Sequence, residues 1–187
     1  KYSALAIARD MNGAGMKASF RATGQTGILI AGSGVPIDAV VSDFVAGAAE
    51  ALSPDNDVDH WDVIEGQGSL FHPAYAGVAL GLLHGSQPDA IILCHAAGRT
   101  HVDGYSDYPL PDLAECIDAN LRLAARTNPD VRCAGISINT SALPPEDREQ
   151  HLRRISAEFG LPCFDPLMTG AHVLVADLER RTQGTVA

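Results

Sequence analysis

Segments typical of strands and of helices alternate along nearly the whole chain, and this pattern constrains the fold most. The clearest strand is DAIILC (89–94), whose unbroken apolar run is typical of a strand buried on both faces. Such alternation predicts an α/β domain with a mostly parallel sheet and helices on both faces. We expect helices within 1–15 and over 36–52, 75–84, 112–126, 146–159 and 170–181, strands over 17–23, 62–64, 89–94, 131–138 and 161–164, and a long polar loop over 95–111.

Composition narrows the class of protein and of partner. The 187 residues carry a formal charge of -10 and a pI near 4.9, which argues against a nucleic acid or an anionic membrane surface as partner. No run approaches the length of a membrane span, so we expect a soluble cytoplasmic protein with a small-molecule or protein partner. The cysteines form no C-x-x-C pair, and we interpret them as reduced core thiols: Cys94, Cys116, Cys133 and Cys163.

The chain opens directly inside a helix, KYSALAIARDMNGAG, in which Leu5, Ile7, Ala8 and Met11 have helical spacing. We therefore expect the strand and Gly-rich turn that feed this helix to lie upstream. On this interpretation, residues 1–187 form a single C-terminal domain of a longer protein. No linker or composition shift divides them further.

Three Gly-rich or polar segments each follow a predicted strand: TGQTG (23–27), EGQGS (65–69) and HAAGRTH (95–101). The carboxyl ends of parallel strands meet at one edge of a sheet, where ligands bind in open α/β folds. We therefore expect these three segments to share one site.

The segment EGQGS places a carboxylate between a strand and two glycines. A carboxylate at this position is suited to holding Mg²⁺ or its water shell beside phosphates, and the glycines let backbone N–H groups approach a ligand. Alternatively, Glu65 caps a helix or pairs with an arginine, and the glycines only make a turn. Candidate residues here are Glu65, Gly66, Gln67, Gly68, Ser69 and His72. If Glu65 acts on the ligand, Glu65→Gln should abolish turnover at little cost in stability.

The segment TGQTG has the composition of a backbone nest for a carboxylate or phosphate, although an ordinary strand-to-helix turn also uses Gly and Thr. Its candidate residues are Arg21, Thr23, Gly24, Gln25, Thr26 and Gly27. Lys1 and Ser3 resemble the tail of a phosphate-binding loop at a helix N-terminus, or else mark an ordinary helix start.

The segment HAAGRTHVDG supplies His95, Arg99, His101 and Asp103. The two histidines lack a recognised metal spacing, so a general acid or base, or an arginine that clamps a carboxylate, fits the pattern better. A surface loop that is rich in histidine by chance is the alternative. No metal ligand set is specified by the sequence.

The words RATGQTGILI and WDVIEGQGS, together with SINTS (137–141), resemble the C-terminal domain of the D-glutamate N-acetyltransferase (DgcN-type) family along nearly the whole chain. The resemblance implies a P-loop-like domain that follows a Rossmann-like N-terminal domain, with Lys1 as the P-loop lysine or the residue after it. It also implies transfer of an acetyl group from acetyl-CoA to the amino group of D-glutamate. We expect the protein to form homo-oligomers.

The chemistry of acetyl transfer suggests roles that the residues leave open. Arg21 or Arg99 would hold the substrate carboxylates, Glu65 or His95 would act as base, and amides of TGQTG or EGQGS would face the oxyanion. The same two segments also resemble dethiobiotin synthetase, so a ligase or carboxylase that uses ATP and Mg²⁺ is the first alternative. A non-catalytic nucleotide-binding regulatory domain is the second.

Overall fold

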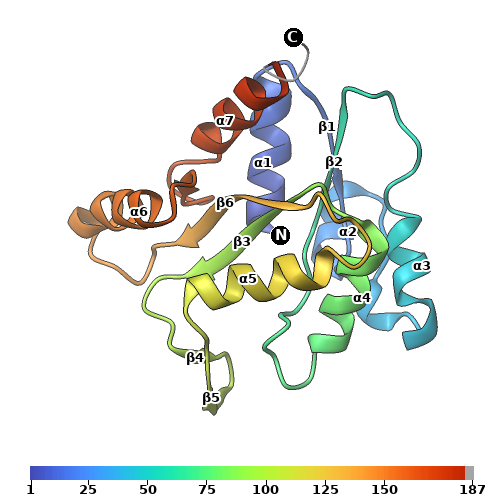
Figure 1. The fold of residues 1–187 in the computed structure, drawn as a ribbon, viewed down its shortest axis with the longest axis horizontal. Helices are drawn as coiled ribbons and strands as arrows, with labels where there is room; N and C mark the ends of the chain where they lie inside the picture. The colour runs from blue at the N-terminus through green and yellow to red at the C-terminus, as the bar shows by residue number, and fades with distance from the viewer. Residues whose placement is uncertain (184–187) are drawn as a thin grey trace.

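A computed structural model describes residues 1–183 and shows the predicted α/β fold (Figure 1). The strands are β1 (Lys17–Arg21), β2 (His60–Ile64), β3 (Ala90–Ala96), β4 (His101–Val102), β5 (Tyr105–Pro109), β6 (Arg132–Asn139) and β7 (Cys163–Phe164). The α-helices are α1 (Tyr2–Gly13), α2 (Gln25–Ala31), α3 (Val45–Glu50), α4 (Ala76–Ser86), α5 (Leu113–Ala124), α6 (Pro145–Phe159) and α7 (His172–Gln183), and two short 3₁₀ turns are η1 (Ile37–Ala39) and η2 (Ser42–Phe44).

The main strands pair in parallel, as predicted. Strand β1 pairs with β2, and β3, β6 and β7 form a second sheet in that order. The sequence pattern predicts one sheet, whereas the hydrogen bonds among the described residues form these two parallel sheets. They share a core, because Trp61 and Val63 of β2 and Ala90 and Ile92 of β3 pack against the same apolar cluster.

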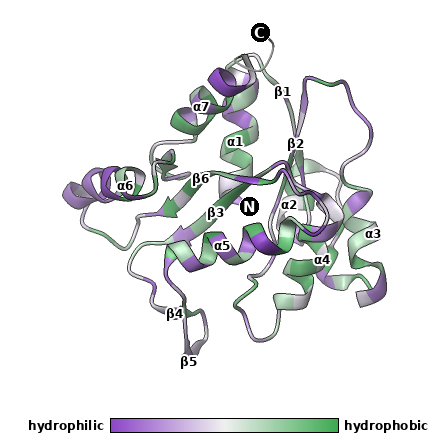
Figure 2. Cartoon of the chain, in the orientation of Figure 1, coloured by the Kyte–Doolittle hydropathy of each residue, from purple (hydrophilic) through white to green (hydrophobic). Residues whose placement is uncertain are grey.

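Helices cover both faces of the β3–β6–β7 sheet. On one face, α1 and α7 contribute Met11 and Leu174 to a cluster with Phe164 of β7. On the other face, α5 and α6 pack against β6, with Leu152 of α6 beside Ile136. Figure 2 shows that α6 keeps its hydrophilic residues on the outside of the molecule. This layering leaves the carboxyl ends of the strands for the loops.

The predicted helix over 36–52 is wrong. The structure replaces it with η1, η2 and the short α3, because Val40 and Val41 take extended backbone angles between the two 3₁₀ turns. β-Branched residues favour extended backbone. The apolar stripe that suggested a helix is not buried as a unit, since Val41 is 67% and Phe44 68% exposed.

The predicted loop over 95–111 is also wrong in part, because it contains the β4–β5 hairpin. Asp103 and Gly104 join the two strands, and Gly104 has a φ of +78°. Of the two turn residues, Gly104 is the one with a positive φ, which glycine adopts without the steric cost of a Cβ atom. The segment TGQTG likewise is not only a loop, since α2 begins at Gln25 with Gly24 as its N-cap.

The four cysteines are free, as expected, but they are not all core residues. Cys116 and Cys163 are buried and Cys133 is half-buried, whereas Cys94 is exposed. Burial raises the pKa of the Cys163 thiol to about 11. None of the helices within residues 1–183 combines the length and apolarity needed to cross a bilayer.

Candidate functional site

The segments TGQTG and EGQGS meet at the carboxyl ends of β1 and β2 and enclose an open cavity of about 420 Å³. This placement follows from the parallel pairing of the two strands, which brings Arg21 opposite Ile64 and so places the following residues side by side. Most of the lining was predicted from the sequence. The lining residues are Lys1, Gly24, Gln25, Thr26, Asp38, Glu65, Gly66 and Gln67.

Glu65 is a structural link between the two segments as well as a lining residue. It is only 3% exposed, and its Oε2 accepts the backbone N–H groups of Thr23 and Gly24 at 3.0 and 3.2 Å. The hydroxyl of Thr23 donates to the Glu65 carbonyl oxygen at 2.7 Å. A Cβ atom at Gly27 would collide with Glu65 Oε2, so this glycine gives the carboxylate its space. Glu65 therefore holds the TGQTG turn against β2.

Lys1 and Ser3 lie at the start of α1 but in different surroundings. Lys1 lines the first cavity, and its backbone nitrogen lies 3.9 Å from Glu65 Oε1. The Ser3 hydroxyl instead shares a hydrogen bond of 2.8 Å with Ser137 of β6 and accepts one of 3.4 Å from the Cys94 thiol of β3. Ser3 thus ties α1 to the β3–β6 pair.

A second cavity of about 470 Å³ lies at the carboxyl ends of β3 and β6. Gly68 and Ser69 of EGQGS line it, so the segment 65–69 contributes to both cavities. Four further residues named from the sequence, His72, His95, Arg99 and Asp103, also line it. The remaining lining residues are Phe71, Leu93, Cys94, Ala96, Val102, Leu110, Leu113, Cys116, Asn120 and Asn139.

His95 is a titratable residue of this cavity whose neutral form is favoured. Burial lowers the pKa of His95 below its ordinary 6.5, and the positive charges of Arg99 and His151 lower it further. A ring kept neutral in this way can accept a proton at physiological pH. The Arg99 side chain is exposed, and it forms no ion pair or hydrogen bond with another side chain within residues 1–183.

The contribution of α5 to the second cavity was not predicted from the sequence. Leu113, Cys116 and Asn120 line the second cavity, and their spacing of three and four residues places them on one helix face. The helix begins where it does because the Asp112 side chain accepts the Glu115 N–H at 2.8 Å as an N-cap. The sequence therefore contained two signals for this contribution, the Asp112 cap and the spacing of the three residues. Asp38, which lines the first cavity from η1, carried no comparable signal.

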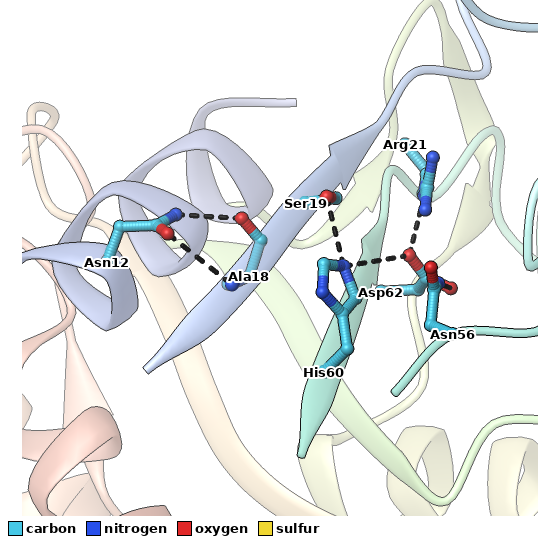
Figure 3. A network of polar contacts seen from close by, with 7 residues as sticks. All are labelled: Asn12, Ala18, Ser19, Arg21, Asn56, His60 and Asp62. Atoms are coloured by element: carbon cyan, nitrogen blue, oxygen red, sulfur yellow. Dashed lines mark hydrogen bonds and ion pairs between the residues drawn. The ribbon is translucent and has the colours of Figure 1, made fainter. Parts of the chain in front are cut away.

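Arg21 is engaged inside the protein and lines neither cavity. Its Nε donates to Asp62 Oδ1 at 2.6 Å across the β1–β2 pair, and Asn56 donates to the other oxygen of Asp62 at 3.0 Å (Figure 3). The His60 ring lies between Ser19 Oγ at 3.0 Å and Asp62 Oδ1 at 3.7 Å. This network fastens β2 to β1 and leaves Arg21 poorly placed to hold a substrate carboxylate.

The donor groups at the site do not form a preassembled metal centre. Among residues 1–183, no group of three or more His, Cys, Asp and Glu side chains is arranged to hold a metal ion. The two carboxylates of the first cavity, Glu65 and Asp38, are the oxygen ligands available there, and one Glu65 oxygen already accepts two N–H groups. A divalent cation would therefore need further oxygens from phosphates and water.

Comparisons with known proteins agree with this architecture. Two curated proteins named D-glutamate N-acetyltransferase match the chain: that of Tritonibacter scottomollicae is 55% identical over 93% of this chain, and that of a Pseudoalteromonas species is 52% identical over 95%. The chain spans about half the length of these relatives, 52% and 53%.

The crystal structure of a DUF1611 family protein from Anabaena variabilis superposes with a TM-score of 0.88 at 36% sequence identity, covering 95% of this chain and 52% of that one. The family model described as a domain of unknown function (DUF1611_C), P-loop domain, matches residues 1–175. From this match, which covers most of the described fold, we conclude that the chain belongs to the DUF1611 family and forms its P-loop domain.

Proposed function

We propose that this chain is the P-loop domain of an N-acetyltransferase that moves an acetyl group from acetyl-CoA to the amino group of D-glutamate. The name of the two curated relatives supports this reaction. The observation that carries the proposal to this chain is the second cavity, where a half-buried histidine with a lowered pKa and an exposed arginine line one space. The rest of the protein would be a further domain, consistent with the length of the relatives.

On the acceptor side, Arg99 is the residue we assign to a carboxylate of D-glutamate. A guanidinium binds a carboxylate through two parallel hydrogen bonds. Arg21 was the other candidate from the sequence, but its Nε already donates to Asp62. A net charge of -10 by itself repels an acidic substrate, so the local positive charge of Arg99 is needed to attract one to this cavity.

We assign the role of base to His95 rather than to Glu65. The neutral His95 ring takes a proton from the substrate ammonium group, and the amine then attacks the thioester carbon. A C–N bond forms, the carbonyl becomes an oxyanion, and its collapse breaks the C–S bond. The ammonium gives up two protons in all, one to the leaving thiolate and one to solvent. Glu65 is less suited, since its Oε2 already accepts two backbone N–H groups.

On the donor side, the first cavity suits the phosphate-bearing part of acetyl-CoA. Lys1 supplies positive charge there, and the backbone of Gly24 and Gly66 lines the cavity without side chains that would keep a phosphate away. Because Gly66 and Gln67 line this cavity and Gly68 and Ser69 line the next, one short segment separates the two. This arrangement suits a long donor with phosphates at one end and a thioester at the other.

The first cavity also supports one alternative, a ligase or carboxylase that uses ATP and Mg²⁺. Asp38 and Glu65 add acidic oxygens beside Lys1, which is the combination that binds Mg²⁺ together with phosphates. This function would place ATP where the acetyltransferase would place the phosphates of CoA.

The test uses the full-length protein and D-glutamate with either acetyl-CoA or ATP, Mg²⁺ and bicarbonate. We expect free CoA to be released only when D-glutamate is present, with no ADP. Release of ADP without CoA would overturn the proposal in favour of the ligase. The variant Arg99→Gln should raise KM for D-glutamate by about tenfold or more, equivalent to one charge-assisted contact. The control Arg21→Gln should leave this KM unchanged.

A further inference from the structure

The imidazole of His72 is held by contacts on several sides. Its Nδ1 accepts the backbone N–H groups of Ala74 at 3.1 Å and Tyr75 at 3.2 Å. The ring stacks on Tyr75, with centroids 4.4 Å apart, and meets the edge of Tyr105 from the β4–β5 hairpin at 5.1 Å. Tyr108 supports Tyr105 at 5.9 Å. Elements distant in sequence therefore fix the position and the plane of one histidine ring.

These contacts also fix where the proton of the neutral ring lies. A ring nitrogen that accepts N–H groups through its lone pair carries no proton, so Nδ1 is the bare nitrogen and Nε2 carries the hydrogen. Within residues 1–183, Nε2 of His72 has no hydrogen-bond partner in the protein. His72 lines the second cavity, which leaves this N–H as a donor for a ligand.

The proposed reaction needs such a donor. The oxyanion that forms on the thioester carbon must be stabilised by hydrogen bonds that are in place before the reaction. The amides of Thr23 and Gly24, which were candidates for this role, donate to Glu65 instead. His95 and His72 line the same cavity and suit different roles. The His95 ring has a lowered pKa and can accept a proton, whereas the His72 ring presents a fixed N–H donor.

We propose that His72 is a catalytic residue that donates its Nε2–H to the acetyl carbonyl oxygen and, more strongly, to the oxyanion of the tetrahedral intermediate. This inference rests on the proposed acetyl transfer to D-glutamate. As the amine attacks the carbonyl carbon, the electron pair of the C=O bond moves onto oxygen beside the His72 N–H. It returns when the C–S bond breaks. His72 itself keeps its proton throughout, so proton transfer remains with His95.

The variant His72→Asn tests this role. An asparagine carbonyl can still accept the N–H groups of Ala74 and Tyr75, as in an Asx turn, but the donor at the position of Nε2 is lost. We expect kcat to fall by about 10²- to 10³-fold, with KM for both substrates nearly unchanged. The control His101→Asn changes an exposed histidine that lines neither cavity, and it should keep full kcat.

A second measurement does not depend on activity. Long-range ¹⁵N–¹H NMR of the wild-type protein should show the neutral His72 ring protonated at Nε2 and not at Nδ1. A proton on Nδ1 would overturn the inference, as would full kcat in His72→Asn while the wild type is active. If the wild-type protein releases no CoA with D-glutamate, the proposed function fails and this role fails with it. Those results separate an error about His72 from an error about the reaction.

Discussion

Replacing Glu65 by glutamine should reduce both stability and turnover, because the carboxylate supports the site from inside the protein. Its Oε2 accepts the N–H groups of Thr23 and Gly24, and its own backbone oxygen accepts the Thr23 hydroxyl. Glutamine keeps one carbonyl acceptor but is neutral. Its NH₂ group must also fit where the second carboxylate oxygen stood. The TGQTG turn should therefore loosen without unfolding the domain.

The magnitude follows from the two hydrogen bonds to Oε2. Bonds to a charged group contribute about 1.5 to 3 kcal/mol and neutral ones about 0.5 to 1.5 kcal/mol, so two weakened bonds cost about 2 kcal/mol. The release of a buried charge offsets part of this loss. Glu65→Ala removes the acceptor altogether and leaves two buried N–H groups unpaired, which costs about 1 to 3 kcal/mol each. We expect stability to fall in the order wild type, Glu65→Gln, Glu65→Ala.

Urea unfolding followed by circular dichroism measures these differences, with the same slope expected for all variants. Asp38→Asn is the matched control, because Asp38 is an exposed carboxylate of the same cavity with no ion pair within residues 1–183. Its free energy of unfolding should stay within about 0.5 kcal/mol of the wild type. If Glu65→Gln unfolds at the wild-type urea concentration yet has no turnover, the structural role is refuted and Glu65 acts directly on the ligand.

Two further predictions test the packing of α4 and the state of His95. Gly85→Ala should destabilise the protein by about 1 to 3 kcal/mol, because the new Cβ atom would collide with the Ala46 backbone. Gly77→Ala in the same helix places its Cβ atom in open space and should stabilise the protein by about 0.5 to 1 kcal/mol. Urea unfolding of both variants measures the two changes. Since the pKa of His95 is lowered by burial and then by Arg99 and His151, the neutral ring is favoured in the folded state. The stability linked to this ring is fully present above pH 6.5 and is lost as the pH falls below that value. The variant His95→Gln should therefore lose less stability between pH 7 and pH 5 than the wild type. An equal loss in the two proteins would contradict this prediction.

The order and type of the main elements could be predicted because the strongest signals are local. The apolar run 89–94 and the cap at Asp112 each specify their element without help from distant residues. Residues 36–52 failed because their apolar spacing fits a helix while Val40 and Val41 take extended backbone. The Asp103-Gly104 pair was a local hairpin signal within a stretch that looked too polar for strands.

The sequence indicated which segments line the cavities more clearly than it indicated the roles of their residues. The rule for parallel sheets predicted one shared site for TGQTG, EGQGS and HAAGRTH, whereas the structure places TGQTG at the first cavity and HAAGRTH at the second, with EGQGS contributing to both. Roles depend on which polar groups are already satisfied inside the protein. The partner of Arg21 is 41 residues away and that of Glu65 is 42 residues away, so neither pairing is visible in the local sequence.

Internal pairing therefore divides the polar residues of this edge into two kinds. Arg21 and Glu65 form hydrogen bonds with neighbouring protein groups and so hold the loops in place. The backbone N–H groups of Thr23 and Gly24 are likewise engaged, because they donate to Glu65. Arg99 and the Nε2 of His72 have no such partner within residues 1–183, although both line the second cavity. A half-buried polar atom without a protein partner, such as Nε2 of His72, gains most from a polar ligand, and the exposed Arg99 guanidinium can bind a carboxylate. For this reason we place the chemistry in the second cavity and assign the first to binding.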